Sequence, residues 1–478
     1  MKNKIVKIFS LLLVMCMMCS AFVGCGSNED VSSDLSSNTS EVESDATDTN
    51  SEVSSNSSKN NKSDISSTTS NKDSSNVSTG NVDPYEGAEK YRGQTVKAVL
   101  WFVPTASEKA SIEAFEKKFG INVEIESTAN DMDIYSTRVA AIIASGEHCD
   151  VTLVQNINIF NNAKNVLKPL DSIKTFHKDD PALDKEAMDA LKVRGKYYSL
   201  NVKSSWQTDS EVMYFNSAAF KKRGVKSPKE YYNEGNWNWD TFLECAKAMT
   251  YTENGTDYYG YTATEWYSFA SSAGIDLVDY NGTEIKSNIN NPTLISALKF
   301  TNELYNKHKV CSPKFYDIQR FCNGTVAMFS NLTYQMTKEQ TGFTNLSSGV
   351  EVDAVPFPSP KGSKTYTPAS YKGFGIMKTS KNPEAAVLFI RWFLDPANDK
   401  REYINPSFAQ LREKVSYDSN KVVAWAEGVM NYGSSTTYDT FLFDCGNNAD
   451  SAQVSTTAQR YEKILNNAIN KCNRIIKK

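Results

Sequence analysis

The fold of this chain is decided by the stretch that runs from Thr95-Val-Lys-Ala-Val-Leu-Trp-Phe-Val103 to Asp150-Val-Thr-Leu-Val154. Its first segment is rich in β-branched and aromatic residues and predicts a buried strand, and its last segment predicts another. Ile121-Asn-Val-Glu-Ile125 alternates apolar and polar residues and predicts a strand between them. Apolar residues at helical spacing over residues 107–119 and 135–145 predict two helices. This alternating order predicts a parallel sheet covered by helices.

Candidate ligand-binding residues lie where these strands end, because parallel sheets bind ligands beyond their carboxyl ends. Trp101 and Thr105 lie at the end of the first strand, and Gln155, Asn156 and Asn158 follow the third. Aromatic faces can pack against a ligand, and amide and hydroxyl groups can hydrogen-bond it, so we expect ligand contacts from all five. Core packing for Trp101 and turn formation for the asparagines are the competing interpretations.

The N-terminus predicts export and lipid attachment. A lysine-rich start is followed by an apolar run over residues 8–23 that is short for a membrane span, which is typical of a signal peptide. Gly24 and Cys25 close this run and resemble a bacterial lipobox, in which Cys25 carries the lipid; an ordinary signal with an incidental cysteine is the alternative. Residues 26–84 are rich in Ser, Asn and Asp, so we expect a disordered tether. We therefore expect the protein to be anchored to the outer face of the cell membrane.

The remaining segments carry a resemblance to a family. They are Met213-Tyr-Phe-Asn, Gly235-Asn-Trp-Asn-Trp-Asp-Thr-Phe242, Phe321-Cys-Asn-Gly-Thr-Val-Ala-Met328, Val355-Pro-Phe-Pro and Gly373-Phe-Gly-Ile. In this order they resemble the family 1 extracellular solute-binding proteins of ABC importers, which include maltose-binding protein.

The resemblance implies an α/β, two-lobed periplasmic-binding-protein-like fold of type II. Each lobe would be a mostly parallel sheet flanked by helices, and a hinge would join the lobes. The expected parts are a signal peptide (1–24), the lipidated cysteine and tether (25–84), an N-terminal lobe (91–204 plus 371–400) and a C-terminal lobe (205–370 plus 401–478).

The resemblance also implies further ligand-binding residues. The first two hinge crossings are expected near residues 203–207 and 366–372. The residues expected to contact ligand at or beyond these crossings are Trp206, Asp209, Glu265, Trp266, Tyr267, Asn331, Tyr334 and Tyr371.

The predicted function is the capture of a carbohydrate, in particular an oligosaccharide, by hinge closure and its delivery to permease subunits on separate chains. The protein is expected to work as a monomer, without cofactor or metal, since its three histidines lie far apart. A net charge of −4 gives no reason to expect nucleic acid. Three alternatives remain. They are a receptor for a peptide or polyol phosphate, a secreted glycoside hydrolase that uses Glu265 with Asp209, and a surface adhesin. An enzyme is not expected.

The cysteines of the mature chain are widely spread, and their spacing leaves disulfides and buried free thiols both open. Besides Cys25, they are Cys149, Cys245, Cys311, Cys322, Cys445 and Cys472.

Overall fold

The computed structural model describes residues 83–263, 267–416, 418, 420–430, 432, 437–446, 448 and 450–477. The predicted signal peptide, Cys25 and nearly all of the predicted tether lie outside these residues. Ten strands form one sheet in the order β2-β1-β3-β11-β4-β9-β6-β5, with β10 paired to β4 and β12 paired to β11. The strands are β1 (Thr95–Leu100), β2 (Asn122–Ser127), β3 (Val151–Gln155), β4 (Thr208–Asn216), β5 (Tyr251–Glu253), β6 (Thr256–Thr262), β9 (Val326–Leu332), β10 (Val352–Pro356), β11 (Thr367–Ile376) and β12 (Lys421–Val423); β7 (Val278–Tyr280) and β8 (Ile285–Ser287) form a separate pair.

The first part of the sheet follows the sequence prediction. β1 pairs in parallel with both β2 and β3, and helices α2 (Ala106–Phe119) and α3 (Met132–Ser145) connect these strands. Both helices end at glycines in the left-handed region, Gly120 at φ 67° and Gly146 at φ 70°, a conformation that glycine adopts without a steric penalty. The α/β fold class is therefore confirmed.

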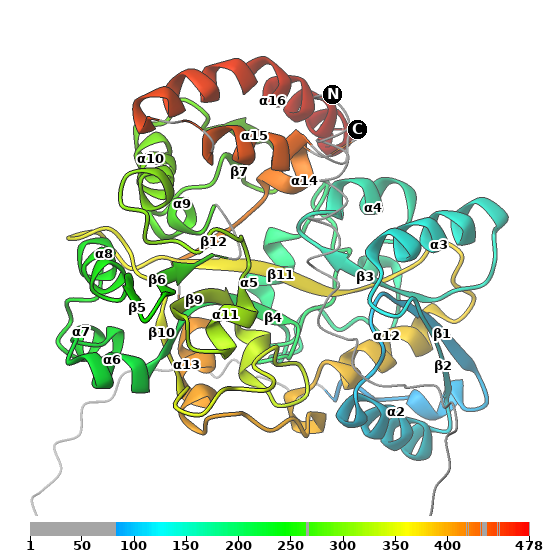
Figure 1. Cartoon of the computed structure of the whole chain (residues 1–478). Coiled ribbons are helices and arrows are strands. Elements are labelled where there is room, and N and C mark those ends of the chain that lie inside the picture. The colour runs from blue at the N-terminus through cyan, green and yellow to red at the C-terminus, as the bar shows by residue number, and fades with distance from the viewer. Residues whose placement is uncertain are drawn as a thin grey trace, which may run out of the picture. The chain divides into compact units, whose positions relative to one another are not determined.

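The second part of the sheet is mixed, which corrects the expectation of a mostly parallel sheet in each half. β4 runs antiparallel to β9, β10 and β11, whereas β6 is parallel to β9. The physical reason is that β4 leads away from the first strands and β11 leads back to them, so these two neighbours run in opposite directions (Figure 1). A tight hairpin at Asn254 and Gly255, both at positive φ, also makes β5 antiparallel to β6.

Helices cover the sheet and bury its apolar side chains. Near the first strands, helix α12 (Pro383–Phe393) packs against α2 and β1, with the rings of Phe389 and Phe115 5.5 Å apart. The other helices are α4 (Ile159–Asn165), α5 (Lys185–Ala190), α6 (Ser217–Arg223), α7 (Pro228–Asn233), α8 (Trp239–Ala248), α9 (Ser268–Ser272), α10 (Pro292–Asn306), α11 (Ile318–Cys322), α13 (Ser407–Ser416), α14 (Ala426–Met430), α15 (Thr437–Gly446) and α16 (Val454–Lys477), with short 3₁₀ turns at Ala88–Tyr91, Leu170–Ser172, Thr333–Met336, Pro396–Asn398 and Ser451–Gln453.

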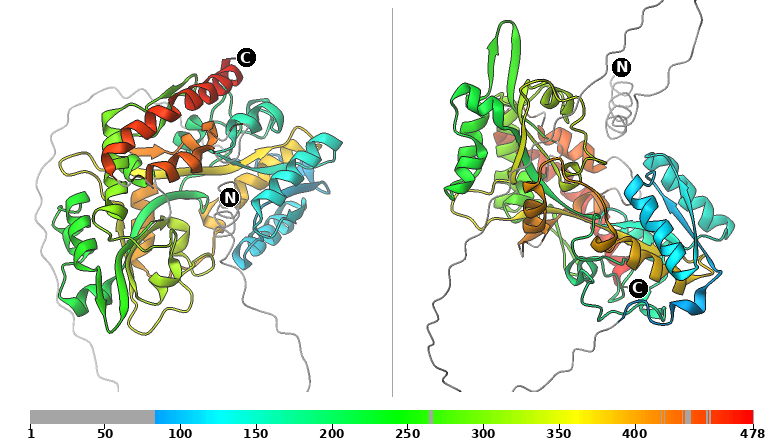
Figure 2. Two further views of the ribbon diagram at one scale, coloured as in Figure 1. Left: turned by 45° about the horizontal axis from the view of Figure 1, so that its top comes forward. Right: turned by 90° about the horizontal axis from the view of Figure 1, so that it is seen from below.

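The C-terminal helix α16 lies across α14 and α15 and also contacts α10 and α4 (Figures 1 and 2). It buries one apolar face, including Leu465, Ile469 and Cys472. Among the described residues no helix is both long and apolar enough to cross a membrane, and no cluster of three histidine, cysteine or acidic side chains is placed to hold a metal ion. The six cysteines within the described part of the chain are buried free thiols: Cys149, Cys245, Cys311, Cys322, Cys445 and Cys472.

Candidate functional site

The predicted residues converge where β11 changes its pairing partner. Lys372 on β11 is opposite Gln155 at the end of β3, whereas Tyr371 is opposite Thr208 at the start of β4. The carboxyl end of β3 and the first residues of β4 therefore meet on adjacent residues of one strand, seen in yellow in Figure 1. We call this place the strand junction. It brings together the predicted residues Gln155, Asn156, Asp209 and Tyr371.

The side-chain amide and the backbone N–H of Asn156 both form hydrogen bonds within the junction. Its side chain, 1% exposed, donates from Nδ2 to the carbonyl of Ala424 at 2.5 Å and accepts from Ser370 Oγ at 3.3 Å. Its backbone N–H donates to the carbonyl of Tyr371 at 3.1 Å. The neighbouring Gln155 differs, because its buried Oε1 has no hydrogen-bond partner among the described residues. A buried acceptor without a partner favours the binding of a water molecule or of a ligand group that donates a hydrogen bond to it.

Asn158 lies in the turn that begins α4, and its Oδ1 accepts from the Gln155 N–H at 3.0 Å. This contact is the turn chemistry that competes with a ligand contact in the sequence interpretation. A ligand contact for Asn158 stays a prediction.

Asp209 is held from both sides of the junction. Lys372 Nζ lies 3.0 Å from its Oδ2, and Thr333 Oγ1 donates to its Oδ1 at 3.2 Å. The side chain of Lys372 is 19% exposed and that of Asp209 is 4% exposed, so their charges compensate each other inside the protein. Sequence reasoning missed Lys372 and Thr333, although Lys372 lies within the predicted second crossing.

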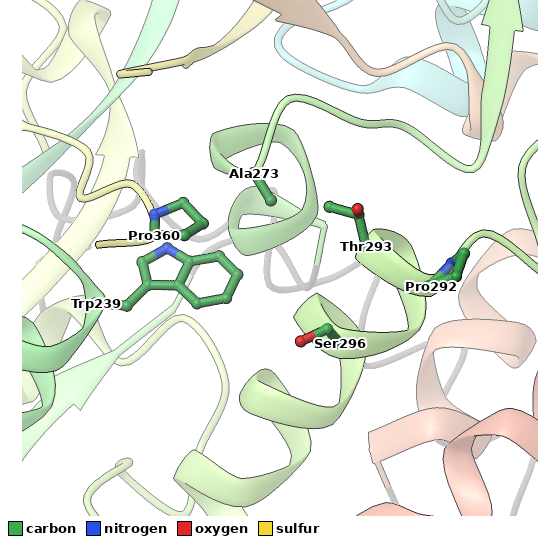
Figure 3. Close-up of a pocket in the computed structure, with 6 residues that line it drawn as sticks. All are labelled: Trp239, Ala273, Pro292, Thr293, Ser296 and Pro360. Atoms are coloured by element: carbon green, nitrogen blue, oxygen red, sulfur yellow. The ribbon is translucent and has the colours of Figure 1, made fainter. Parts of the chain in front are cut away.

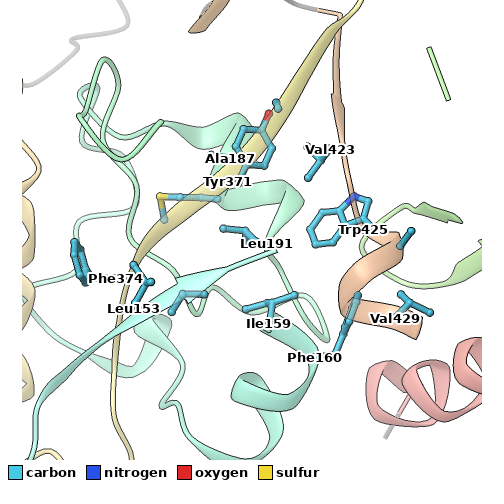
Figure 4. Close-up of a cluster of buried hydrophobic side chains, with 14 of the residues drawn as sticks. Leu153, Ile159, Phe160, Ala187, Leu191, Tyr371, Phe374, Val423, Trp425 and Val429 are labelled. Carbon is cyan, nitrogen blue, oxygen red and sulfur yellow. The ribbon is translucent and has the colours of Figure 1, made fainter. Parts of the chain in front are cut away.

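Tyr371 is 2% exposed, and its hydroxyl donates to Glu186 Oε1 at 2.8 Å. Burial and the neighbouring Glu186 carboxylate raise the pKa of Tyr371 well above its usual value. Lys421 Nζ lies 3.7 Å from the other oxygen of Glu186. The tyrosine therefore links β11 to α5 and to the strand β12, and Figure 4 shows its ring beside Val423.

Trp206 is packed in the core beside the junction. Its ring contacts Phe102 and Phe393, and its Nε1 donates to the Phe393 carbonyl at 3.1 Å. The guanidinium of Arg401 lies 4.5 Å from the ring centroid. These are the contacts of a packing anchor, and a ligand contact for Trp206 stays a prediction. Sequence reasoning did not identify Arg401.

Trp101 and Thr105 lie after β1, which ends at Leu100 and not at residue 103 as the sequence predicted. Trp101 is half-buried, and its carbonyl accepts from the Asn130 N–H at 2.7 Å. Thr105 forms a capping box with Glu108 at the start of α2, since its hydroxyl accepts from the Glu108 N–H at 3.3 Å. The hydroxyl of Thr105 therefore has a structural partner already.

The last predicted residues come from the end of β9 and the start of α9. Asn331 is 1% exposed, and the hydroxyl of Tyr334 accepts from Gln335 Nε2 at 3.1 Å. Tyr267 immediately precedes α9, with its ring 6.4 Å from that of Tyr438. Glu265 and Trp266 lie outside the described residues.

An aromatic group covers the segment that follows β3. Phe160 on α4 lies 5.1 Å from Tyr280 and 6.1 Å from Trp425, measured between ring centroids, and Tyr280 lies 5.2 Å from Trp425. Figure 4 shows Phe160 and Trp425 facing each other from α4 and the segment before α14. Asp276 Oδ2 fixes the segment that leads into α14, because it accepts hydrogen bonds from the N–H groups of Trp425 and Ala426 at 2.7 and 3.0 Å. Trp425 was not among the residues predicted from the sequence.

A separate hollow of about 310 Å³ lies away from these residues, between α8, α9 and α10 (Figure 3). Trp239 forms one wall, but its Nε1 is already used by Ser272 Oγ at 3.1 Å and the Pro358 carbonyl at 3.0 Å. Its ring stacks on Phe300 at 4.7 Å. This agrees with a structural role for Trp239 at the start of α8. The lining residues are Trp239, Ala273, Pro292, Thr293, Ser296 and Pro360.

Comparison with known proteins fits this architecture. A probable ABC transporter-binding protein of Deinococcus radiodurans is 24% identical over 407 residues, which cover 81% of this chain and 84% of that protein. An ABC substrate-binding protein from Listeria monocytogenes, solved in complex with cycloalternan, superposes with a TM-score of 0.58 at 20% identity, over 80% of this chain and 98% of that one. A protein from Mycobacterium tuberculosis, solved with glycerophosphocholine, gives a TM-score of 0.60 at 16% identity, over 79% of this chain and 98% of that one.

These structural likenesses show a shared two-lobed fold. The sequence profile of the bacterial extracellular solute-binding proteins matches residues 110–425, which span most of the described chain and include the strand junction. The chain therefore belongs to the bacterial extracellular solute-binding protein family.

Proposed function

We propose that this protein captures a carbohydrate, in particular an oligosaccharide, and delivers it to the permease of an ABC importer. Binding would close an N-terminal lobe (91–204 plus 371–400) on a C-terminal lobe (205–370 plus 401–478), and the protein would act as a monomer. Membership of a receptor family supports the capture step and gives no support to catalysis.

The observation that carries the carbohydrate assignment is the compensated charge at the strand junction. Asp209 and Lys372 neutralise each other at 3.0 Å, and the Glu186 carboxylate beside Tyr371 lies 3.7 Å from Lys421 Nζ, so these charged groups of the junction are paired. Gln155 adds a buried acceptor without a described partner. Such a site suits a neutral ligand that offers many hydroxyl donors, which is the chemistry of a sugar.

A phosphorylated polyol is the second candidate, because the similar protein from Mycobacterium tuberculosis was solved with glycerophosphocholine. Phosphate recognition usually draws arginine. Near the junction, Arg401 is occupied: its Nε donates to Asp399 at 2.9 Å and its Nη1 to Gln340 at 3.2 Å. This occupancy favours the neutral ligand.

A glycoside hydrolase that pairs Glu265 with Asp209 is less well supported. Both carboxylate oxygens of Asp209 have partners, Lys372 and Thr333. Using Asp209 as a nucleophile or a base would break this buried ion pair, at a cost of several kcal/mol.

A thermal-shift screen tests the assignment. Soluble protein lacking residues 1–84 would be heated with oligosaccharides (maltotriose, mannobiose, cycloalternan), glycerophosphocholine and short peptides. At about 100 times Kd, a sugar that binds should raise Tm by about 3–5 °C. A shift with glycerophosphocholine or peptides and none with any sugar would refute the carbohydrate assignment. Loss of intact oligosaccharide during incubation would instead indicate a hydrolase.

Anchoring at Cys25 after removal of residues 1–24 belongs to the same proposal and has its own test. The full chain should partition with membranes, and its Cys25→Ser variant should appear in the medium. Equal membrane partition of both proteins would contradict lipid attachment at Cys25.

A further inference from the structure

Glu211 is a carboxyl group buried without a counter-charge. It lies on β4, is 2% exposed, and is contacted by the hydroxyls of Ser268 on α9 and Ser330 on β9. Its Oε1 has no hydrogen-bond partner among the described residues, and no described lysine or arginine pairs with it. Burying an ionised carboxylate without a counter-charge is costly, so these surroundings favour the protonated, neutral form of Glu211.

The two serines connect Glu211 to both ends of one short segment. Ser330 Oγ lies 2.9 Å from the hydroxyl of Tyr261, which is on β6 just before that strand ends. Ser268 is the first residue of α9 and directly follows Tyr267. The carboxyl group of Glu211 thus joins the end of β6 to the start of α9, and Tyr267 lies at the latter.

We propose that Glu211 is a positioning residue for Tyr267, and that loss of its proton loosens the attachment of α9 to β6 and β4. The proposal rests on the proposed function in one respect, which is the assignment of Tyr267 to ligand binding. It goes beyond that function by making the order of the binding region depend on pH.

The direction of this pH dependence follows from the surroundings of the Glu211 carboxyl group. Burial raises the pKa of Glu211 to about 7, and Tyr261 is the titratable neighbour that senses its charge. When α9 opens locally, water reaches Glu211 and its pKa returns to an ordinary value near 4–5. At any pH between these two pKa values, opening of α9 therefore releases a proton from Glu211. Opening becomes easier as the pH rises toward 7. Below this window both states hold the proton, so pH has no effect.

Hydrogen exchange of the protein without any ligand tests the proposal. Deuterium uptake by residues 259–273 would be followed from pH 5 to pH 8 and corrected for the intrinsic exchange rate. In the native chain, protection of α9 should fall by up to about tenfold per pH unit between pH 5 and 7, because one proton is released. In the Glu211→Gln variant, which keeps the shape but cannot ionise, the slope should vanish.

Two controls separate local from global effects. Residues 107–119, in α2, should show no such slope in either protein, since a shared slope would indicate global unfolding. Tyr261→Phe removes the hydroxyl that meets Ser330 but keeps the carboxyl group, so it should lower the protection of α9 and retain the slope.

Equal slopes in the native chain and the Glu211→Gln variant, or no slope in either, would overturn the proposal. This result needs no ligand, so it is separate from the outcome of the sugar screen. If the exchange result is as expected and maltotriose, mannobiose and cycloalternan all fail to shift Tm, the positioning of α9 stands and the carbohydrate assignment falls.

Discussion

Lys372 Nζ and Asp209 Oδ2 lie 3.0 Å apart, and this ion pair crosses from β11 to β4 at the residue where β11 begins to pair with β3. The pair is largely buried and joins residues that are 163 positions apart in the sequence. It therefore couples the two strands that connect the halves of the sheet. Its contribution to stability and to ligand binding can be separated by experiment.

Replacing Lys372 with methionine should destabilise the protein by about 2–4 kcal/mol, because the buried Asp209 carboxylate loses its counter-charge. The double variant Lys372→Met with Asp209→Asn removes both charges and should recover at least half of this loss. Urea unfolding of both single variants and the double variant gives the coupling free energy. Additive effects would show that the two charges do not interact.

Arg401 should be equally hard to replace. Its side chain is 2% exposed, stacks on Trp206, and lies 3.8 Å from Glu108 Oε1. Burial already raises the pKa of Glu108, and Arg401 opposes this rise. Arg401→Met should therefore cost about 2–4 kcal/mol. Removing Arg401 raises the folded-state pKa of Glu108 further, so the loss should be greater at pH 8 than at pH 5.

The Arg401→Lys variant is the matched comparison. Lysine keeps the charge but loses the planar group that stacks on Trp206, so we expect an intermediate loss with little pH dependence. Urea unfolding at both pH values measures the two effects. An identical loss for lysine and methionine would show that stacking, and not charge, determines the role of Arg401.

Much of the first part of the sheet could be predicted because its signals are local. Strand and helix periodicities, with glycines at positions 120 and 146, locate α2 and α3 to within a few residues. Local signals were less exact where two candidate caps compete. At α8, Asn238 and Asp240 are both suitable N-cap residues by type, and Asn238 is the cap, because its Oδ1 accepts from the N–H groups of Asp240 and Thr241.

The candidate site was harder to predict, because its contacts join distant segments. Strand ends directed attention to Gln155 and Asn156, which lie at the strand junction, yet the partners of Asp209 could not be read from the sequence around it. Lys372 is one of many lysines, and its charge carries no periodic signal that marks a buried partner. The same holds for Trp425, whose place against Phe160 depends on how the C-terminal segment folds back.

The free thiols should be unreactive toward thiol reagents in the folded protein. Burial raises the pKa of Cys149, Cys245, Cys445 and Cys472 to about 12 and that of Cys322 to about 11, so almost no thiolate exists at pH 8. Burial also raises the pKa of the Cys311 thiol. Protein lacking residues 1–84 should show no fast-reacting thiol toward Ellman's reagent, and all six should react in guanidinium chloride. Rapid reaction of a native thiol, or fewer than six in denaturant, would contradict this assignment.

Gly428 on α14 allows a close approach between the C-terminal segment and the residues after β3. A Cβ atom there would lie 2.8 Å from the Ile157 carbonyl oxygen and 2.9 Å from that of Asn156, which is closer than real Cβ contacts. Gly428→Ala should therefore push α14 away and weaken the hydrogen bond from Asn156 Nδ2 to Ala424.

We expect Gly428→Ala to cost about 1–3 kcal/mol of stability and to lower the affinity for whichever sugar raises Tm in the screen. The expected loss is a consequence of backbone crowding, so it should persist when Phe160→Leu creates space nearby without moving the carbonyl groups of residues 156 and 157. Calorimetric titration and urea unfolding measure the two effects. Native affinity in Gly428→Ala would show that close packing of α14 on this segment is not needed for binding.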